Sequence, residues 1–328
     1  MGTIARKAMA AVMGLVLVAA FSALAADYKP GSGPYRVRTT DYEWRDAARN
    51  RIVPVRIHAP DDPGHLFPVV IFSHGLGGSR AAGAAWGEHW ASHGYVAVHL
   101  QHAGSDEALW RDAVASGAGE AMRSMKGGIN ARNTIARLKD VSFALDRLEA
   151  IDRSDPAWRH RLDLGRVGIA GHSFGAETTL GAAGKRYGAR ELALADRRIR
   201  AAIAMSPPAG ADAAFAAIRV PVMVLTGTLD DSPAWLTPTK AADRRTVFDG
   251  LPPRDKFLVV FDGGDHMVFS GQPRRRGDAS ADAFIHRQIR MATVAFWDAY
   301  LRDDAAAREW LALEWRAVLG AGGALEQK

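Results

Sequence analysis

The stretch RVGIAGHSFGAETTLGAAG, residues 166–184, joins a short apolar run directly to a serine flanked by two glycines. Continuous apolar runs of this length are typical of strands buried on both faces. Ala176 and Glu177 then begin a segment with helical character. The stretch therefore predicts a sharp strand-to-helix turn with Ser173 at its apex. Gly171 and Gly175 would remove the Cβ atoms that otherwise clash in such a turn.

The rest of the chain repeats the same alternation of strand and helix. Residues Ile135, Leu138, Val141, Leu145 and Leu148 follow the spacing of an amphipathic helix. Alternating strands and helices predict an α/β fold, with a mostly parallel central sheet and helices on both faces. The expected buried strands are PVVIF (68–72), YVAVHL (95–100), RVGIA (166–170), IRAAIAM (199–205), VPVMVL (220–225) and KFLVVF (256–261).

Two earlier segments have a different pattern. Residues 35–38 and 51–58 alternate apolar and polar side chains, as half-exposed antiparallel strands do, and predict an antiparallel N-terminal edge of the sheet. The chain has no internal repeat, so we expect residues 26–328 to form a single domain. Only about 14 residues separate the fourth and fifth apolar runs, too few for a large helical lid.

Residues 1–25 are expected to be a cleaved signal peptide. Arg6 and Lys7 precede an apolar run that ends in Ala23-Leu24-Ala25, a small-residue site that suits a signal peptidase. The alternative, a membrane anchor, is disfavoured because the run is shorter than the ~20 residues of a spanning helix. We therefore expect an exported protein, periplasmic or extracellular, without a stable membrane anchor.

Composition narrows the possible partners. The 328 residues contain no cysteine, which excludes disulfides and a lipoprotein anchor. Without residues 1–25 the chain has 40 basic and 36 acidic side chains, a surplus too small and too dispersed to indicate nucleic-acid binding.

Ser173 needs a base and an acid if it is a nucleophile rather than a helix cap. His266 lies in the glycine-containing loop 262–266 just beyond the last expected strand, where it can fold back over Ser173. The acid should follow the preceding strand, where Asp230 and Asp231 are adjacent. We prefer Asp230, three residues after Gly227, and the chain order Ser, Asp, His suits an elbow of this kind.

A negatively charged oxygen that forms during ester or amide cleavage requires preorganised donors. The backbone N–H of Phe174, at the start of the helix, is one expected donor. The loop SHGLGG (73–78) follows the first buried strand, and we assign the second donor to the backbone N–H of Leu76. A plain glycine turn is the alternative for this loop.

Other residues near the expected strand ends are weaker candidates. His102, Trp235 and Met267 are possible pocket residues, although His102 and Trp235 also suit surface or core positions. His89 and His93 stand four apart on an expected helix, but the sequence lacks the glutamate of a zinc-protease motif, so we expect no metal. The long connection 103–133 is expected to border the substrate cleft.

The motifs SHGLGGSR, WASHGYVAV, GHSFGAET and DGGDHMVF together resemble secreted α/β-hydrolases. More narrowly, residues 65–300 are similar to esterases of the dienelactone-hydrolase-like and platelet-activating-factor-acetylhydrolase-like groups, and more distantly to cutinase-like polyester hydrolases. The resemblance implies catalytic roles for Ser173, Asp230 and His266, and oxyanion roles for Leu76 and Phe174. Dienelactone hydrolases proper use a cysteine nucleophile, which this chain lacks.

These features predict a serine carboxylic-ester hydrolase that forms an acyl-enzyme, needs no cofactor, and acts on a small-molecule or lipid-like ester. An acyltransferase would use the same residues, and a non-catalytic binding protein on this scaffold is a third possibility. The sequence leaves the natural ester, its acyl length, activity on polymers and the oligomeric state open.

Overall fold

The central sheet of the computed structural model has nine strands, in the order β1-β2-β4-β3-β5-β6-β7-β8-β9. The structure describes residues 30–328 except 115–116, 189–193, 234–235, 237–238 and 273–278. Strands β3 to β8 are parallel to one another, with bounds β3 Phe67–Ser73, β4 Val96–Leu100, β5 Leu162–His172, β6 Ile199–Met205, β7 Val222–Leu229 and β8 Lys256–Asp265. This confirms the α/β fold and the six buried strands predicted from the apolar runs.

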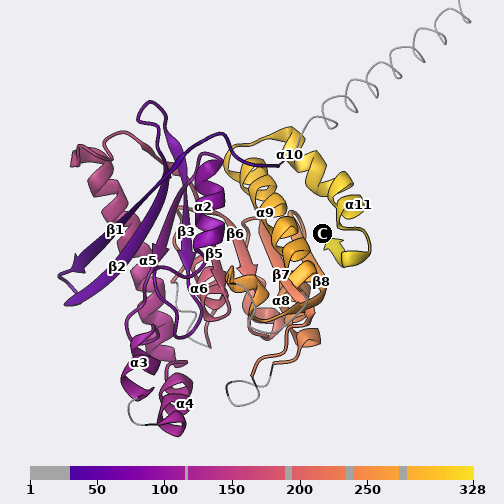
Figure 1. Cartoon of the computed structure of the whole chain (residues 1–328), viewed down its shortest axis with the longest axis horizontal. Helices are drawn as coiled ribbons and strands as arrows, with labels where there is room; N and C mark the ends of the chain where they lie inside the picture. The colour runs from indigo at the N-terminus through magenta and orange to yellow at the C-terminus, as the bar shows by residue number, and fades with distance from the viewer. Residues whose placement is uncertain (1–29, 115–116, 189–193, 234–235, 237–238, 273–278) are drawn as a thin grey trace, which may run out of the picture.

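Antiparallel strands form both edges of the sheet (Figure 1). Strand β1 (Val37–Asp46) pairs with β2 (Arg51–Pro60), and β2 pairs antiparallel with β4. The predicted N-terminal edge is therefore confirmed, although β1 continues well beyond residue 38. At the opposite edge, β9 (Gly323–Gln327) pairs antiparallel with β8, a strand that the sequence pattern did not indicate.

Helices cover both faces of the sheet, as predicted. The core over one face includes side chains from α5 (Ala131–Ser154), α6 (Phe174–Ala182), α7 (Asp212–Phe215) and α8 (Thr246–Gly250), and α8 is preceded by the 3-10 helix η1 (Ala241–Arg245). The core over the other face includes side chains from α2 (Ala84–Ser92), η2 (Val268–Ser270), α9 (Ala279–Leu301), α10 (Ala305–Glu309), η3 (Trp310–Glu314) and α11 (Trp315–Leu319), and η4 (Gly320–Gly322) leads into β9.

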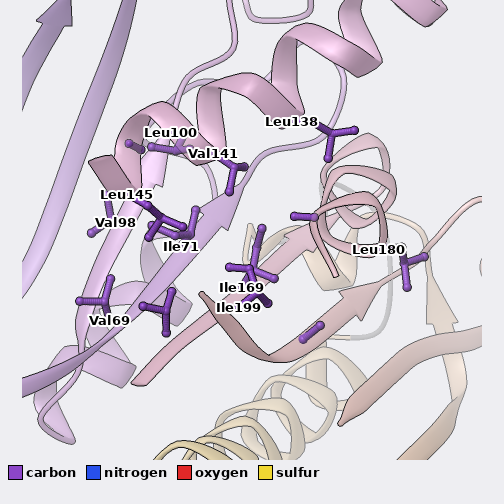
Figure 2. Packing of buried hydrophobic residues seen from close by; sticks show 14 of the residues in the cluster. Val69, Ile71, Val98, Leu100, Leu138, Val141, Leu145, Ile169, Leu180 and Ile199 are labelled. Carbon is purple, nitrogen blue, oxygen red and sulfur yellow. The ribbon is translucent and has the colours of Figure 1, made fainter. Parts of the chain in front are cut away.

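The strand period of two divides each buried run between the two cores. Val69 and Ile71 of β3 belong to the core beneath α5 and α6, whereas Val70 and Phe72 belong to the core beneath α2 and α9. Figure 2 shows the first of these cores, where Leu138, Val141 and Leu145 of α5 lie over the strands. This double burial explains why the parallel strands read as continuous apolar runs.

The long connection after β4 forms two helices, α3 (Ala108–Val114) and α4 (Ala118–Gly127), which extend away from the sheet in Figure 1. They lie beyond the carboxyl end of β4, and the Trp110 Nε1–H donates to the Gly77 carbonyl at 2.9 Å. The insertion is thus attached to the loop that follows β3. The carboxyl ends of the parallel strands, where α/β folds place their sites, lie at this end of the sheet.

Candidate active site

Ser173 occupies a strained turn between β5 and α6. Its backbone has φ 56° and ψ −116°, in a region that residues with a side chain rarely adopt. A Cβ added to Gly175 would lie 1.8 Å from the Ser73 carbonyl oxygen, and one added to Gly171 would lie 2.3 Å from the Gly175 carbonyl oxygen. Both glycines are therefore required by close backbone approach, and the turn exposes the Ser173 hydroxyl beyond the sheet.

The structure brings Ser173, His266 and Asp230 into one hydrogen-bonded chain. The Ser173 Oγ lies 2.9 Å from His266 Nε2, and His266 Nδ1 lies 2.8 Å from Asp230 Oδ1. With Nδ1–H donating to the carboxylate, Nε2 is left free to accept the serine proton. His266 directly follows β8, and Asp230 directly follows β7, so the two strand ends deliver both side chains to the elbow.

The Asp230 carboxylate is fully buried and held by several donors. Its Oδ2 accepts hydrogen bonds from Ser206 Oγ at 2.5 Å and from Thr226 Oγ1 at 2.8 Å. Asp231 instead points to the surface, where Lys240 Nζ lies 2.8 Å from its Oδ2. The geometry therefore favours Asp230 over Asp231 as the partner of His266.

Arg244 is a neighbour of this chain that sequence reasoning missed. Its buried guanidinium lies 2.9 Å from Asp230 Oδ1 through Nε, and its Nη2 approaches His266 Nδ1 at 3.2 Å. Burial lowers the pKa of Arg244, while the charge of Asp230 opposes that shift. Its sequence context, a charged run 241–245, looks like a solvated helix face, so no local pattern distinguishes it.

His172, the residue before the nucleophile, supports the other side of His266. Its Nε2–H donates to the His266 carbonyl at 2.8 Å, and the two rings lie 4.8 Å apart. Burial lowers the pKa of His172 well below its usual value, so this imidazole is neutral. A neutral His172 places no additional positive charge against His266.

The two expected oxyanion donors are available. Among the residues that the structure describes, the backbone N–H groups of Leu76 and Phe174 donate to no protein acceptor. The loop of Leu76 passes close to the elbow, since a Cβ added to Gly75 would lie 3.5 Å from Ser173 Cβ. Both amides are thus without an acceptor among the described residues, which is a property that donors of an oxyanion hole need.

A cavity of about 450 Å³ opens beside the nucleophile, large enough for a small organic ligand. Glu177 and Lys185 form an ion pair in its wall, with Lys185 Nζ 2.7 Å from each carboxylate oxygen. Most other lining side chains are apolar. The lining residues include Ser173, Phe174, Arg244, Ile129, Ala131, Ile135, Tyr187, Leu194, Pro208, Ala209 and Leu236.

The lining of this cavity differs in part from the predicted pocket. His102 is fully buried and absent from the cavity lining, because its ring is held beneath the loop 73–78 by Ser73 and Asp140. Met267 is half exposed and does not line the cavity. Trp235 lies outside the described residues. Residues 129–131, at the end of the connection after β4, do line the cavity.

His89 lies on α2, and His93 is the residue directly after the end of that helix. The His89 and His93 rings lie 4.7 Å apart, yet no group of three potential ligands occurs in the part of the chain that the structure describes. The described residues also contain no helix of the length and apolar character that a bilayer crossing needs. Residues 1–25, predicted as a signal peptide, lie outside the described part.

The parallel sheet, the strained serine between β5 and α6, and the order of the three hydrogen-bonded residues define an α/β-hydrolase. The family model described as platelet-activating factor acetylhydrolase, isoform II, matches residues 45–227, more than half of the chain. The chain belongs to this family. The match includes Leu76, Ser173 and Phe174 and ends before Asp230 and His266.

Curated relatives agree with the family. The chain is 29% identical to the platelet-activating factor acetylhydrolase of Cavia porcellus over 184 residues, which are 49% of this chain and 40% of the relative. It is 25% identical to the Bos taurus enzyme of the same name over 233 residues, covering 63% of this chain and 48% of the relative. The chain therefore spans less than half the length of these relatives, and the predicted resemblance to this esterase group is confirmed.

Proposed function

We propose that this protein is a serine carboxylic-ester hydrolase in which Ser173, His266 and Asp230 are the catalytic residues. One observation carries the proposal: the Ser173 Oγ lies 2.9 Å from an imidazole whose other nitrogen is bound to a buried carboxylate. A helix cap does not need such a partner. The strained backbone of Ser173, maintained by two glycines that cannot carry a Cβ, supports the same reading.

The proposed reaction proceeds through an acyl-enzyme. As Ser173 Oγ attacks the ester carbonyl carbon, His266 Nε2 takes the hydroxyl proton, and the imidazolium is stabilised by Asp230. The Leu76 and Phe174 amides donate to the carbonyl oxygen while it is negative. Collapse of the tetrahedral intermediate expels the alcohol, which receives the proton from His266. Water, deprotonated by His266, then releases the acid.

The cavity supports a small-molecule or lipid-like ester as the substrate. Its volume of about 450 Å³ and mainly apolar wall suit an acyl or alcohol chain of modest size. The curated relatives are named acetylhydrolases, which favours a short acyl group here as well. No step of this reaction requires a cofactor or a metal ion.

We also propose that the protein is exported and that residues 1–25 are removed. Arg6, Lys7 and the following apolar run support this, together with the Ala23-Leu24-Ala25 site. N-terminal sequencing of protein from the periplasm or medium should begin at Ala26. An intact N-terminus on protein retained with the membranes would show an anchor instead.

The test of the proposed activity is hydrolysis of p-nitrophenyl esters from acetate to decanoate by the wild type and Ser173→Ala. The wild type should cleave the shorter esters, and the variant should lose about 10³-fold or more in kcat. Equal rates would refute the nucleophile. Product analysis with an added alcohol acceptor identifies an acyltransferase, since the new ester would then exceed the free acid. A wild type without turnover would favour a binding protein.

A further inference from the structure

A buried arginine lies beneath the loop that contains Leu76. Arg137, on α5, is fully buried, and its Nε donates to Thr178 Oγ1 at 2.9 Å. Its Nη1 donates to Ser105 Oγ at 2.9 Å, and its Nη2 donates to Ser73 Oγ at 3.1 Å and to the His74 carbonyl. Among the described residues it forms no ion pair with a carboxylate.

Such a cation is expensive to bury. Removing a guanidinium from water without a directly paired anion disfavours the charged form, and burial lowers the pKa of Arg137 to about 9. Arg137 is still charged at neutral pH. A side chain retained at such a cost, with nearly all of its donors satisfied by defined acceptors, is a candidate for a functional role rather than for simple packing.

The contacts of Arg137 join the two segments that provide the oxyanion donors. Ser73 and His74 begin the loop that leads to Leu76, and Thr178 lies one turn after Phe174 on α6. The Arg137 guanidinium carbon also lies 4.5 Å from the centre of the Phe174 ring. One planar group therefore fixes the distance between the Leu76 loop and the start of α6.

A second layer of hydrogen bonds fixes the orientation of Ser73. His102 Nδ1–H donates to Asp140 Oδ2 at 2.9 Å, so His102 Nε2 accepts the Ser73 hydroxyl proton at 2.9 Å. The Ser73 oxygen is left to accept from Arg137. Asp140 is held in turn by Arg51, whose Nε and Nη2 each lie 2.8 Å from its carboxylate. The direction of each hydrogen bond is thus determined.

The same layer also holds His74. The His102 backbone N–H donates to His74 Nε2 at 3.0 Å, and His74 Nδ1–H donates to the Gly75 carbonyl at 2.6 Å. Burial keeps both imidazoles neutral by lowering their pKa values, that of His102 to about 4. The backbone immediately before Leu76 is therefore bound on both sides.

We propose that Arg137 is a positioning residue that holds the Leu76 loop against the start of α6, in the arrangement in which both amides bind the oxyanion. This inference rests on the proposed function. Arg137 is absent from the cavity lining and acts through the loop, not on the substrate. It therefore affects the transition state, whose oxygen is charged, far more than substrate binding.

The experiment compares Arg137→Lys, Arg137→Ala and Thr178→Val with the wild type. It measures kcat and KM for p-nitrophenyl acetate, and Ki for an aryl trifluoromethyl ketone, which adds to the serine oxygen and forms a tetrahedral oxyanion. Removing one oxyanion donor costs about 10²–10³ in kcat in other hydrolases, so displacing one should cost about 10–10². KM should change by less than about threefold, and Ki should rise by the factor that kcat/KM falls.

Chemical rescue separates positioning from stability. Guanidinium ion at non-denaturing concentrations should raise the kcat of Arg137→Ala by at least about tenfold, because it supplies the missing donors. Sodium ion at the same concentration should not raise it. Arg302→Lys is the matched control. Arg302 lies 4.2 Å from the Tyr95 ring, pairs with Asp298 at 2.8 Å and donates to the His93 and Gly94 carbonyls just before the amino end of β4, whereas Ser173 follows the carboxyl end of β5. Its kcat should be unchanged.

The outcomes distinguish the two proposals. Folded Arg137 variants with kcat and Ki close to wild type would overturn the positioning role while leaving the esterase intact. If both Arg137 variants fail to fold, Thr178→Val decides, and unchanged kcat and Ki in that variant would overturn the role. A wild type that neither cleaves esters nor reacts with a fluorophosphonate would refute the proposed function, and the positioning role with it.

Discussion

Replacing Asp230 by asparagine should lower kcat for ester hydrolysis by about 10⁴-fold with little change in KM. The carboxylate lies 2.8 Å from His266 Nδ1 and is fully buried, so its negative charge faces the imidazolium that forms during the reaction. The amide keeps the shape of the side chain, and the hydroxyls of Ser206 and Thr226 remain within reach of it. The variant therefore removes the negative charge and should leave the fold intact.

The magnitude follows from the distance. Two unit charges 2.8 Å apart attract by about 6 kcal/mol at an effective dielectric constant of about 20. Each 1.4 kcal/mol of barrier is about tenfold in rate, which gives about four orders of magnitude. Arg244 Nη2, 3.2 Å from His266 Nδ1, remains in the variant. In this variant the His266 imidazolium would lie next to the Arg244 cation without the Asp230 carboxylate. The loss in kcat should therefore be no smaller than about 10⁴-fold.

The assay is steady-state hydrolysis of p-nitrophenyl acetate, with thermal unfolding to confirm that each variant is folded. Asp231→Asn is the matched control, because it removes the same charge one residue away. The Asp231 side chain is exposed and paired only with surface partners, so its kcat should stay within about threefold of wild type. A folded Asp230→Asn variant with near-normal kcat, or a large loss in Asp231→Asn, would refute this assignment.

Three further predictions concern the elbow, the cavity and the core. Gly175→Ala should lower the free energy of unfolding by about 3 kcal/mol or more, because its Cβ would lie 1.8 Å from a backbone oxygen, whereas Gly119→Ala, with open space around it, should change it by less than about 1 kcal/mol in urea denaturation. Equal stability of the two variants would contradict the close approach. Ile135→Phe, in the cavity wall, should reduce kcat/KM for p-nitrophenyl decanoate at least about tenfold more than for the acetate, and a uniform loss would place the acyl chain elsewhere. Burial lowers the pKa values of His58 and His102 from 6.5 to about 4, so the unfolded chain binds more protons than the native state between these values. The contribution of these two histidines to the free energy of unfolding should be full above pH 6.5 and be lost as pH decreases from 6.5 to 4. The decline should continue below pH 4, because burial lowers the pKa of His99 to about 3 and the partners of Asp140 lower its pKa as well; a flat profile between pH 6.5 and 4 in urea titrations at each pH would contradict neutral burial.

Much of the fold could be predicted because burial on both faces makes the parallel strands continuous apolar runs. Strand β9 was not predicted, because its five residues, GALEQ, contain a single buried leucine, Leu325, at the edge of the sheet. Its pairing with β8 depends on the path of the C-terminal helices, which no local pattern records. Strand β1 continues to Asp46 through residues 41–45, in which charged and aromatic side chains alternate. This alternation is the pattern of a half-exposed strand, so the longer strand was available from the sequence.

The site could be predicted only where a motif fixes the local geometry. The glycines around Ser173 and the position of His266 after the last parallel strand mark a turn that sequence alone can indicate. The choice between Asp230 and Asp231 depends on which side chain the turn after β7 directs inward, and two adjacent aspartates look alike in sequence. The burial of Arg137 and Arg244 could not be predicted, because an arginine in a helical segment is usually exposed and nothing in the local sequence marks these two as buried.

His102 illustrates the opposite error. A histidine at the carboxyl end of a parallel strand is a reasonable pocket candidate, yet its ring lies beneath the loop 73–78, bound to Ser73 and Asp140. Both partners come from distant parts of the chain, 29 and 38 residues away. Only tertiary structure reveals that such a residue supports the site from below.

The most direct measurement is intact-mass and peptide analysis after treatment with a fluorophosphonate, which reacts with activated serines. The account predicts one covalent adduct per wild-type chain, located on Ser173, and none on folded Ser173→Ala or His266→Ala at the same exposure. An adduct on another residue, or equal labelling of Ser173→Ala, would contradict Ser173 as the activated nucleophile.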